Sequence, residues 1–411
     1  MKPYDIAIIG AGPAGIMASL FAAKNGAKVV LIEKNDIIGR KILATGNGRC
    51  NLTNKFVNVT SYHGDNPSFV EPIFSQFGSE QTVAFFESLG VVLKEEDRGR
   101  IFPRTNQAST IVQALEHELS ENKVTVMVKS IVKNIERDKL WQIDIEDNNQ
   151  LLAKSLVLTT GGKAAFQFGS SGDGLFWAKK LGHTIEPLYA ALVPIETAES
   201  WPATIQGLKV EAKIKAFYKN NPLAEKTGDL LFTHYGLSGP AVMSLSGDFA
   251  DKADDKQNNV RLEIDFFPEA DTRELHEKIN SIFQSNGAKS ALNNLRGMIP
   301  QNLLELILYN MSLDKDKKSA EFSNAEIGNI IKAFKSTVLH LKKLRPLKEA
   351  QVTRGGICLK EIDNNTLESK KIQNLFFAGE IIDIDGDSGG FNLQWAWSSG
   401  YVAGSHASNQ R

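Results

Sequence analysis

The chain has 411 residues, of which 42% are hydrophobic and 23% are charged. This near-average composition excludes a disordered or fibrous chain, and the length predicts two or three domains of roughly 150 residues each. The 47 Lys and Arg residues balance 48 Asp and Glu residues, and the formal net charge of −1 excludes a whole-protein attraction to nucleic acid or to an anionic membrane. We therefore expect neither a DNA partner nor a membrane partner.

The two cysteines, Cys50 and Cys358, lie far apart in the sequence and lack the paired spacing of a zinc ribbon or a redox dithiol. We therefore expect no disulfide framework. The first apolar run is short and soon broken by glycine, unlike a secretory signal peptide. No apolar run approaches the roughly 20 residues of a membrane helix. These features predict a soluble, cytoplasmic protein.

The N-terminal segment is typical of a βαβ unit. An apolar strand over residues 4–9 leads through a glycine turn to a helix over 13–25 and a second strand over 29–33. Helical spacing recurs over 81–89 and 110–122. Further strands are predicted over residues 124–128, 130–136, 141–146 and 155–159. This pattern predicts a nucleotide-binding α/β domain.

The middle of the chain changes pattern after Pro187 and Pro194. Alternating segments over 208–218, 230–233 and 260–267 predict an antiparallel sheet or a small barrel. Helical runs follow over residues 275–283, 291–298, 303–311 and 325–334. Strand-like segments and a final helix are predicted over residues 339–344, 350–353, 375–378 and 392–407.

These patterns predict three domains, two of them discontinuous. Residues 1–192 and 354–411 form the nucleotide-binding domain in this division. Residues 193–270 and 337–353 form the β-sheet or barrel domain, and residues 271–336 form a helical insert.

The first motif is a glycine-rich turn between the first predicted strand and helix, with the sequence GAGPAG. Gly10 permits the tight turn, Gly12 lets the backbone approach a pyrophosphate, and Gly15 lets the helix pack closely on the strand. Glu33, at the end of the next strand, would accept hydrogen bonds from a ribose. The combination predicts a dinucleotide site, and an ordinary turn between strand and helix is the alternative.

A second motif occupies residues 39–54, GRKILATGNGRCNLTN, and combines cations, amides and small turn residues. Its cations would neutralise phosphate, and its glycines would let a planar ring approach the main chain. The alternative is a solvated connecting loop. Cys50 lies inside this segment, but without a nearby second cysteine a packed side chain is favoured over a redox role.

A third group of motifs lies near the C-terminus, where a predicted buried strand ends at Gly379. Asp383, Asp385 and Asp387 follow, and they would bind polyol hydroxyls. The series lacks the terminal glutamate of a calcium loop, so we predict no metal. Gly390 then opens the last helix, whose N-terminus would stabilise the negative charge of a reduced ring.

Together these motifs resemble the conserved bacterial FAD proteins of the BaiN/RdsA type, which are related to the glutathione-reductase-like flavoproteins. The resemblance rests on GAGPAG with Glu33, GRKILATGNGRCNLT, TTGG, LLFTHYGLSGP, VTRGG and FFAGEIIDIDGDSGGFNLQWAWSSG, and it covers essentially the whole chain. It implies an α/β fold with a Rossmann-type FAD-binding domain, an inserted antiparallel β domain that is barrel-like, and a small helical domain.

The resemblance also implies non-covalent FAD and a set of contacts. The ADP half would be held by Gly10, Gly12, Ala14, Gly15 and Glu33, with Val132 beside the adenine. The passage from phosphate to flavin would be lined by Arg40, Lys41, Thr45, Gly46 and Asn51. The ribityl chain and the isoalloxazine would be covered by Gly379, Glu380, Asp385, Asn392 and Leu393. Neighbouring positions in the same motifs complete the predicted contacts: Pro13, Lys34, Asn47, Gly48, Thr160, Gly161, Gly162, Gly390 and Phe391.

Two side chains are candidates for catalysis. His234, in FTHYG, is the candidate for proton transfer, with a structural hydrogen-bonding role as the alternative. Arg100, which with Arg104 flanks Ile101-Phe102-Pro103, would meet an anionic substrate or a nicotinamide phosphate, with a solvated basic loop as the alternative.

The sequence has no second glycine fingerprint for a nicotinamide nucleotide. Residues 169–174, GSSGDG, are rich in glycine but have the wrong spacing for one. NAD(P)H would therefore dock transiently on an exposed flavin face. We expect an FAD-dependent oxidoreductase, namely an NAD(P)H-driven reductase that passes hydride through flavin N5 to a small organic substrate, as the family's bile-acid reductases suggest.

Two alternatives stay open. One is an oxidase of a small amine or amino acid that produces hydrogen peroxide, as aminoacetone-oxidase-like members suggest. The other is a non-catalytic FAD-stabilised scaffold or RNA-associated flavoprotein, which the near-zero net charge disfavours in its RNA form.

Overall fold

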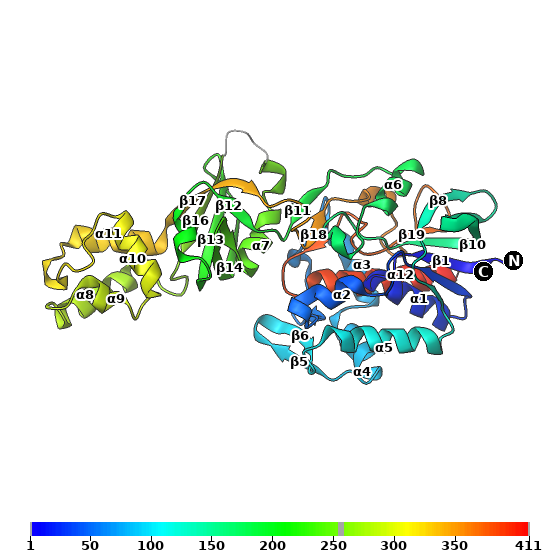
Figure 1. Ribbon diagram of the computed structural model, residues 1–411, viewed down its shortest axis with the longest axis horizontal. Coiled ribbons are helices and arrows are strands. Elements are labelled where there is room, and N and C mark those ends of the chain that lie inside the picture. The colour runs from blue at the N-terminus through cyan, green and yellow to red at the C-terminus, as the bar shows by residue number, and fades with distance from the viewer. Residues whose placement is uncertain (1, 254–258, 410–411) are drawn as a thin grey trace. The chain divides into compact units, whose positions relative to one another are not determined.

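A computed structural model describes residues 2–253 and 259–409 of the chain. It divides into two compact units, Met1–Ala190 with Leu347–Arg411, and Ala191–Pro346 (Figure 1). Each unit has a hydrophobic core of its own. No helix within the described ranges is long and apolar enough to cross a membrane.

The first unit is built on a seven-stranded sheet with the order β7-β2-β1-β10-β9-β8, and β19 pairs with β10. The strands are β1 (Tyr4–Ile9), β2 (Val29–Ile32), β7 (Thr125–Met127), β8 (Val132–Arg137), β9 (Trp141–Ile145), β10 (Asn149–Leu158) and β19 (Leu375–Phe377). β1 is parallel to both β2 and β10, and β10 is parallel to β19. The central strands are almost wholly apolar because both faces of a parallel sheet are covered.

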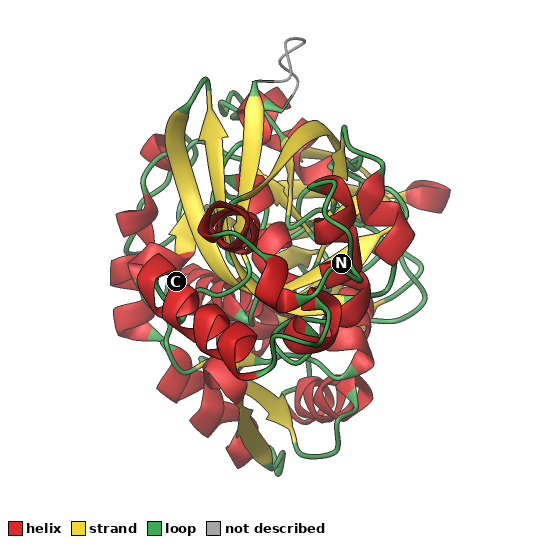
Figure 2. Cartoon of the chain, turned by 90° about the vertical axis from the view of Figure 1, so that its left-hand side faces the viewer, coloured by secondary structure: helices red, strands yellow, loops and turns green. Residues whose placement is uncertain are grey.

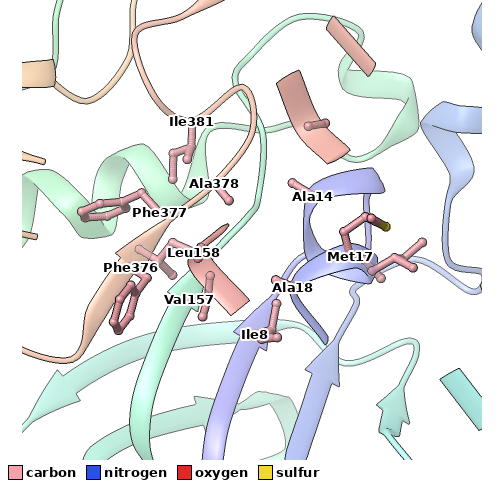
Figure 3. Packing of buried hydrophobic residues seen from close by; sticks show 14 of the residues in the cluster. Ile8, Ala14, Met17, Ala18, Val157, Leu158, Phe376, Phe377, Ala378 and Ile381 are labelled. Atoms are coloured by element: carbon pink, nitrogen blue, oxygen red, sulfur yellow. The ribbon is translucent and has the colours of Figure 1, made fainter. Parts of the chain in front are cut away.

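Helices from both ends of the chain pack together in this unit. α1 (Pro13–Lys24) lies against α12 (Phe391–Ser408), where Gly400 and Gly404 let the backbones approach. A Cβ atom at Gly400 would lie only 2.3 Å from the carbonyl oxygen of Ala14. Figure 3 shows buried side chains of β1, α1, β10 and β19 in the core. This packing joins the two ends of the sequence into one unit.

Smaller elements surround this framework. The other helices are α2 (Arg40–Ala44), α3 (Glu71–Gln76), α4 (Ser79–Ser88), α5 (Ala108–Glu121) and α6 (Asp173–Lys180). A small sheet has the order β3-β6-β5, and β4 pairs with β20. The short strands are β3 (Thr53–Asn54), β4 (Tyr62–His63), β5 (Leu93–Glu96), β6 (Arg100–Pro103), β11 (Tyr189–Ala191), β18 (Val352–Arg354) and β20 (Asp385–Gly386).

The second unit contains a closed barrel with the order β12-β15-β14-β13-β16-β17. Its strands are β12 (Ile195–Thr197), β13 (Lys209–Tyr218), β14 (Asn221–Thr233), β15 (Gly236–Ser238), β16 (Val260–Asp265) and β17 (Thr337–Leu344). Its helices are α7 (Pro240–Gly247), α8 (Thr272–Ser285), α9 (Ala291–Leu295), α10 (Gln301–Asn310) and α11 (Asn324–Lys335). Figure 2 draws the helices of the chain in red and the strands in yellow.

Two helices of this unit start at capping boxes that the sequence supplies. Asp271 and Glu274 form a reciprocal capping box at α8, and Ser323 and Glu326 form another at α11. The apolar faces of α8 to α11 belong to the same buried cluster as the barrel interior. The structure thus groups residues 271–336 with the barrel in one unit, and residues 347–353 with the first unit.

The predicted fold class is confirmed. The chain has an α/β nucleotide-binding unit of the Rossmann type, an antiparallel barrel, and helices in the segment between two barrel strands.

Candidate functional site

The glycine turn after β1 has the geometry that its sequence predicts. Gly10 has φ +105°, and a Cβ atom there would lie 2.7 Å from the carbonyl oxygen of Thr159. A Cβ atom at Gly15 would lie 1.9 Å from the carbonyl oxygen of Gly10. At Gly12, by contrast, a Cβ atom would meet no described atom within 4 Å. The first and last glycines therefore serve the fold, whereas Gly12 leaves space beside the start of α1.

The N-terminus of α1 is suited to an anion. Gly12 is the N-cap residue, Pro13 follows it, and no described side chain caps this end of the helix. The N–H groups of a first helical turn have no partner within the helix, and the helix dipole adds positive potential there. A phosphate placed beside Gly12 would meet these groups.

Glu33 lies next to this turn and is 8% exposed. Its Oε2 accepts a hydrogen bond of 2.8 Å from the N–H of Ala11. Its Oε1 accepts from the backbone N–H of Asn35 at 2.8 Å and from Asn35 Nδ2 at 2.7 Å. Because each carboxylate oxygen has two lone pairs, Oε2 keeps capacity for one more donor. Glu33 thus shapes the turn and can still accept from a hydroxyl.

Val132 is the first residue of β8, and the segment before it lies beside Glu33. The backbone N–H of Ser130 donates to the carbonyl oxygen of Glu33, at 2.9 Å. The segment entering β8 therefore passes directly beside Glu33.

Two predicted cations make contacts within the protein. Lys34 Nζ lies 2.8 Å from Asp173 Oδ2 and also donates to Ser171. Arg40 Nη1 donates to Asn35 Oδ1 at 3.0 Å. Lys34 and Arg40 therefore stabilise the segment around Asn35 that follows β2.

The segment after α2 has an unusual backbone. Gly46, Asn47 and Gly48 all have positive φ values, of 57°, 56° and 82°. A Cβ atom at Gly46 would lie 2.9 Å from the backbone nitrogen of Asn51. Oδ1 of Asn51 is buried and has no hydrogen-bond partner among the described residues. A buried acceptor of this kind calls for a donor from outside the described chain.

Cys50 in the same segment is fully buried. Burial raises the pKa of its thiol to about 12, although a hydrogen bond with Thr45 opposes the shift. Because the thiolate is the reactive form, a thiol with this pKa is inert at neutral pH. Of the two roles considered for Cys50, the packed side chain is the one this environment supports.

An ion pair connects α2 to the C-terminal motif. Lys41 Nζ lies 2.5 Å from Glu380 Oε2. Glu380 Oε1 accepts from the backbone N–H of Thr353 at 2.8 Å, and Thr353 Oγ1 accepts from the backbone N–H groups of Lys163 and Ala164, each at 2.8 Å. Glu380 and Thr353 thereby join four segments that are distant in sequence.

The TTGG segment packs tightly against this network. A Cβ atom at Gly162 would lie 2.3 Å from Thr353 Oγ1, and Gly161 has φ +73°. Oγ1 of Thr160 is buried without a partner among the described residues.

The three C-terminal aspartates have separate partners. Asp385 receives Arg354 in a bidentate pair, with Nε–Oδ1 2.9 Å and Nη2–Oδ2 3.0 Å. Asp387 Oδ1 lies 3.0 Å from His63 Nε2. Asp383 Oδ2 accepts from the backbone N–H of Asp65 at 3.1 Å, and burial raises the pKa of Asp383 to about 6. In residues 2–253 and 259–409, no three His, Cys, Asp or Glu side chains are grouped to hold a metal ion.

The start of α12 is built on two glycines with positive φ. A Cβ atom at Gly390 would lie 2.6 Å from the carbonyl oxygen of Thr53. Asn392 Oδ1 accepts from the N–H of Gly386 at 2.8 Å, and its Nδ2 donates to the carbonyl oxygen of Gly386 at 2.7 Å. The carbonyl oxygen of Phe391 accepts from the Tyr62 hydroxyl at 3.0 Å, and Leu393, two positions further on, is buried. These contacts orient the first turn of α12.

The catalytic candidates fall in different units. Arg100 is in the first unit, on β6, opposite Asn54 of β3. His234 is exposed in the second unit, in the turn between β14 and β15, with its ring 4.8 Å from that of Tyr235.

Sequence reasoning missed several residues that organise this region. Asn35, Asn54 and Thr353 each bond to a group more than 100 positions away in the chain, and Arg354 pairs with Asp385. The sequence identified the VTRGG motif, which contains Arg354. It did not predict that Arg354 pairs with the buried Asp385.

Comparison with known proteins gives whole-chain matches. The family model described as HI0933-like protein Rossmann domain matches residues 4–406. The chain is 34% identical over 407 residues to the 3-dehydro-bile acid delta(4,6)-reductase of Clostridium scindens, covering 98% of this chain and 99% of that protein. It is 30% identical over 414 residues to the ribosomal RNA dihydrouridine synthase of Haemophilus influenzae, covering 98% of each.

Among solved structures, 3-ketosteroid delta1-dehydrogenase from Sterolibacterium denitrificans matches with a TM-score of 0.54. The match has 13% sequence identity and covers 100% of both chains. At this identity the likeness shows a shared fold alone.

Proposed function

The chain belongs to the HI0933-like family and is an FAD-dependent oxidoreductase, and from this premise we propose that it is an NAD(P)H-driven reductase of a small organic substrate. The observation that carries the proposal is the 34% identity, along 98% of the chain, to a protein named as a reductase. The glycine turn and the Lys41–Glu380 network support it with groups suited to FAD.

We assign the ADP half of FAD to the turn from Gly10 to Gly15. Gly12 leaves room for the pyrophosphate, and the uncapped end of α1 would donate to it. The spare acceptor capacity of Glu33 suits a ribose hydroxyl. The segment entering β8, with Val132, would lie along the adenine.

We assign the flavin half to the C-terminal motifs and the segment after α2. The buried, unpartnered Oδ1 of Asn51 supports the presence of a donor from a ligand. Lys41 and Glu380 hold the two motifs in register, and the N-terminus of α12 would place positive potential at the ring. The protein supplies orientation and electrostatics, whereas bound FAD would supply hydride transfer through its N5 atom.

A carbon–carbon double bond conjugated to a carbonyl group is the substrate class we propose. Hydride would add to the carbon remote from the carbonyl, the negative charge would develop on the carbonyl oxygen, and a proton from water would complete the addition of two hydrogens. The name of the Clostridium scindens relative denotes reduction of ring double bonds in a 3-oxo compound, which is chemistry of this class.

The test uses the FAD-loaded protein, reduced without oxygen by one equivalent of dithionite and mixed with a cyclic enone, with an isolated alkene of similar size as control. We expect the enone to reoxidise the flavin and to gain two hydrogens, measured by mass spectrometry. Reoxidation by oxygen alone, together with hydrogen peroxide formation from an amine, would instead identify an oxidase.

A second candidate is favoured by the 30% identity to the ribosomal RNA dihydrouridine synthase, which covers 98% of both chains. In this case the reduced double bond belongs to a uridine of ribosomal RNA. Incubation with unmodified ribosomal RNA and NADPH, followed by nucleoside mass spectrometry, distinguishes the two. Dihydrouridine formation without enone reduction would select the RNA substrate.

A further inference from the structure

Phe56 is an exposed aromatic side chain in the first unit, with 57% of its surface accessible. It follows β3 and lies against Gly99, in the turn between β5 and β6. A Cβ atom at Gly99 would lie 2.7 Å from Phe56 Cδ2, so the ring packs directly against this glycine. The ring is thus supported from one side and accessible on the rest of its surface.

The turn beneath this ring has a backbone conformation that ordinary residues seldom adopt. Arg98 has φ +61°, and Gly99 has φ +68°. Positive φ at a non-glycine residue costs free energy, and such positions concentrate at functional sites. The strain persists here because the surrounding contacts hold it.

Asn54 supplies those contacts and is 2% exposed. Its Nδ2 donates to the carbonyl oxygen of Arg98 at 3.1 Å and to that of Gly389 at 3.0 Å. Its Oδ1 accepts from the backbone N–H of Phe56 at 2.9 Å. One amide therefore ties the exposed ring and the strained turn to the glycine pair that starts α12, where the proposed flavin ring lies.

Arg100 stands beside this turn without a carboxylate partner among the described residues. Its Nε donates to the carbonyl oxygen of Asp97 at 3.0 Å. Glu96 is its cross-strand neighbour in the β5–β6 pair. That carboxylate is instead bound by Lys94, at 2.7 Å, and by Arg49, and these cations lower its pKa. Arg100 thus retains guanidinium N–H donors for an anion from outside the protein.

From this arrangement we infer that the turn is the docking site for NADPH, with Arg100 binding the 2′-phosphate and Phe56 stacking on the adenine. The 2′-phosphate lies on the adenosine ribose, so one ligand presents an aromatic ring and a dianion side by side. A guanidinium is suited to that phosphate, and an exposed phenyl ring is suited to the base. The bond from Asn54 to Gly389 places the turn beside the start of α12, so a nucleotide bound at the turn would have its nicotinamide end near the proposed flavin ring. The inference rests on the proposed NAD(P)H-driven function.

The experiment compares the FAD-loaded wild-type protein with Arg100→Gln, Phe56→Ala and the control Lys139→Gln. Lys139 is an exposed cation of the same unit, in the turn between β8 and β9. Flavin bleaching is followed without oxygen by stopped flow at increasing NADPH and NADH. Reduction by dithionite and the visible spectrum confirm that each variant keeps its flavin.

We expect Arg100→Gln to raise the half-saturating NADPH concentration about tenfold, as the loss of a charge-assisted hydrogen bond predicts. The half-saturating NADH concentration and the limiting rate of bleaching should not change. Phe56→Ala should raise the half-saturating concentrations of both nucleotides. Lys139→Gln should change neither. A wild-type ratio of half-saturating NADPH to NADH concentrations in Arg100→Gln would overturn the proposed docking site but leave the proposed function standing. A wild-type flavin that neither nucleotide bleaches would overturn the proposed function as well.

Discussion

Lys41 and Glu380, 339 positions apart in the sequence, form an ion pair in which Nζ lies 2.5 Å from Oε2. Their side chains are 25% and 16% exposed, so water screens the pair only in part. The pair fastens α2 to the motif after β19, the two segments to which we assign the flavin half of the cofactor site.

We predict that Glu380→Gln lowers the free energy of unfolding by about 1–3 kcal/mol, because it leaves a partly buried ammonium without its counter-ion. It should also weaken FAD binding. Urea unfolding and FAD titration measure both effects. Glu95→Gln is the matched control, because the Lys55–Glu95 pair is 59% and 48% exposed and should contribute less than about 1 kcal/mol. Equal losses in the two variants would contradict a special role for Lys41 and Glu380.

The open space at Gly12 predicts a variant that folds but does not bind FAD. Gly12→Val would place its side chain where no described atom lies within 4 Å, so the fold should tolerate it while the pyrophosphate is displaced. We expect FAD affinity to fall by more than about tenfold, measured by flavin fluorescence titration. Gly297→Val, at another position with no described atom within 4 Å, should retain FAD. A Gly12→Val protein that purifies yellow would refute the pyrophosphate assignment.

Asp383 predicts a pH dependence of stability. Its pKa is about 6 in the folded protein, against an ordinary value of 3.8, because burial disfavours the charged form. The folded state therefore binds the proton more tightly than the unfolded state. Its contribution is fully present below about pH 4 and is lost as the pH rises toward and past 6.

Asp383→Asn removes this titration while keeping an acceptor for the N–H of Asp65. We expect the variant to gain stability relative to wild type between pH 4.5 and pH 7.5, by up to about 3 kcal/mol. Urea unfolding at the two pH values measures the difference. Parallel pH profiles of the two proteins would show that Asp383 does not titrate as described.

We predict that the Cys50 thiol is unreactive in the native protein. With a pKa of about 12, its thiol stays protonated at pH 8 and should not react with an aromatic disulfide reagent in the native protein, although it should react in urea. Cys50→Ala should keep the rate of flavin reduction within about twofold, as expected for a packed side chain. Rapid native labelling of Cys50 with loss of that rate would establish a redox role instead.

Local patterns were sufficient to predict much of the fold. The βαβ unit with Gly10, Gly15 and Glu33 follows from spacing and glycine chemistry within one short stretch. β14 was predicted only over 230–233, whereas it begins at Asn221. Its first half has few apolar residues and becomes a strand because it pairs with β13 along the hairpin. α7 was missed because its short apolar run has no helical period that a sequence alone distinguishes from a strand.

The candidate site was predictable as a set of motifs but not as a network. Asn54 and Thr353 form hydrogen bonds with residues 335 and 190 positions away, and no local sequence pattern predicts such contacts. Glu33 was predicted as a ribose acceptor, and its bonds to Ala11 and Asn35 depend on how the turn folds back. Arg100 was a candidate because it flanks Ile101-Phe102-Pro103, and only the structure shows that Arg49 and Lys94 bind its cross-strand neighbour Glu96.

Reduced nicotinamide nucleotides, in our proposal, donate electrons to FAD in this protein. The most direct test is the visible absorbance spectrum of the purified, FAD-loaded protein without oxygen, recorded before and after NADPH and then NADH. We predict flavin bands that bleach within seconds, and faster with NADPH. Flavin bands that persist with both nucleotides, in a protein that dithionite still reduces, would contradict the account.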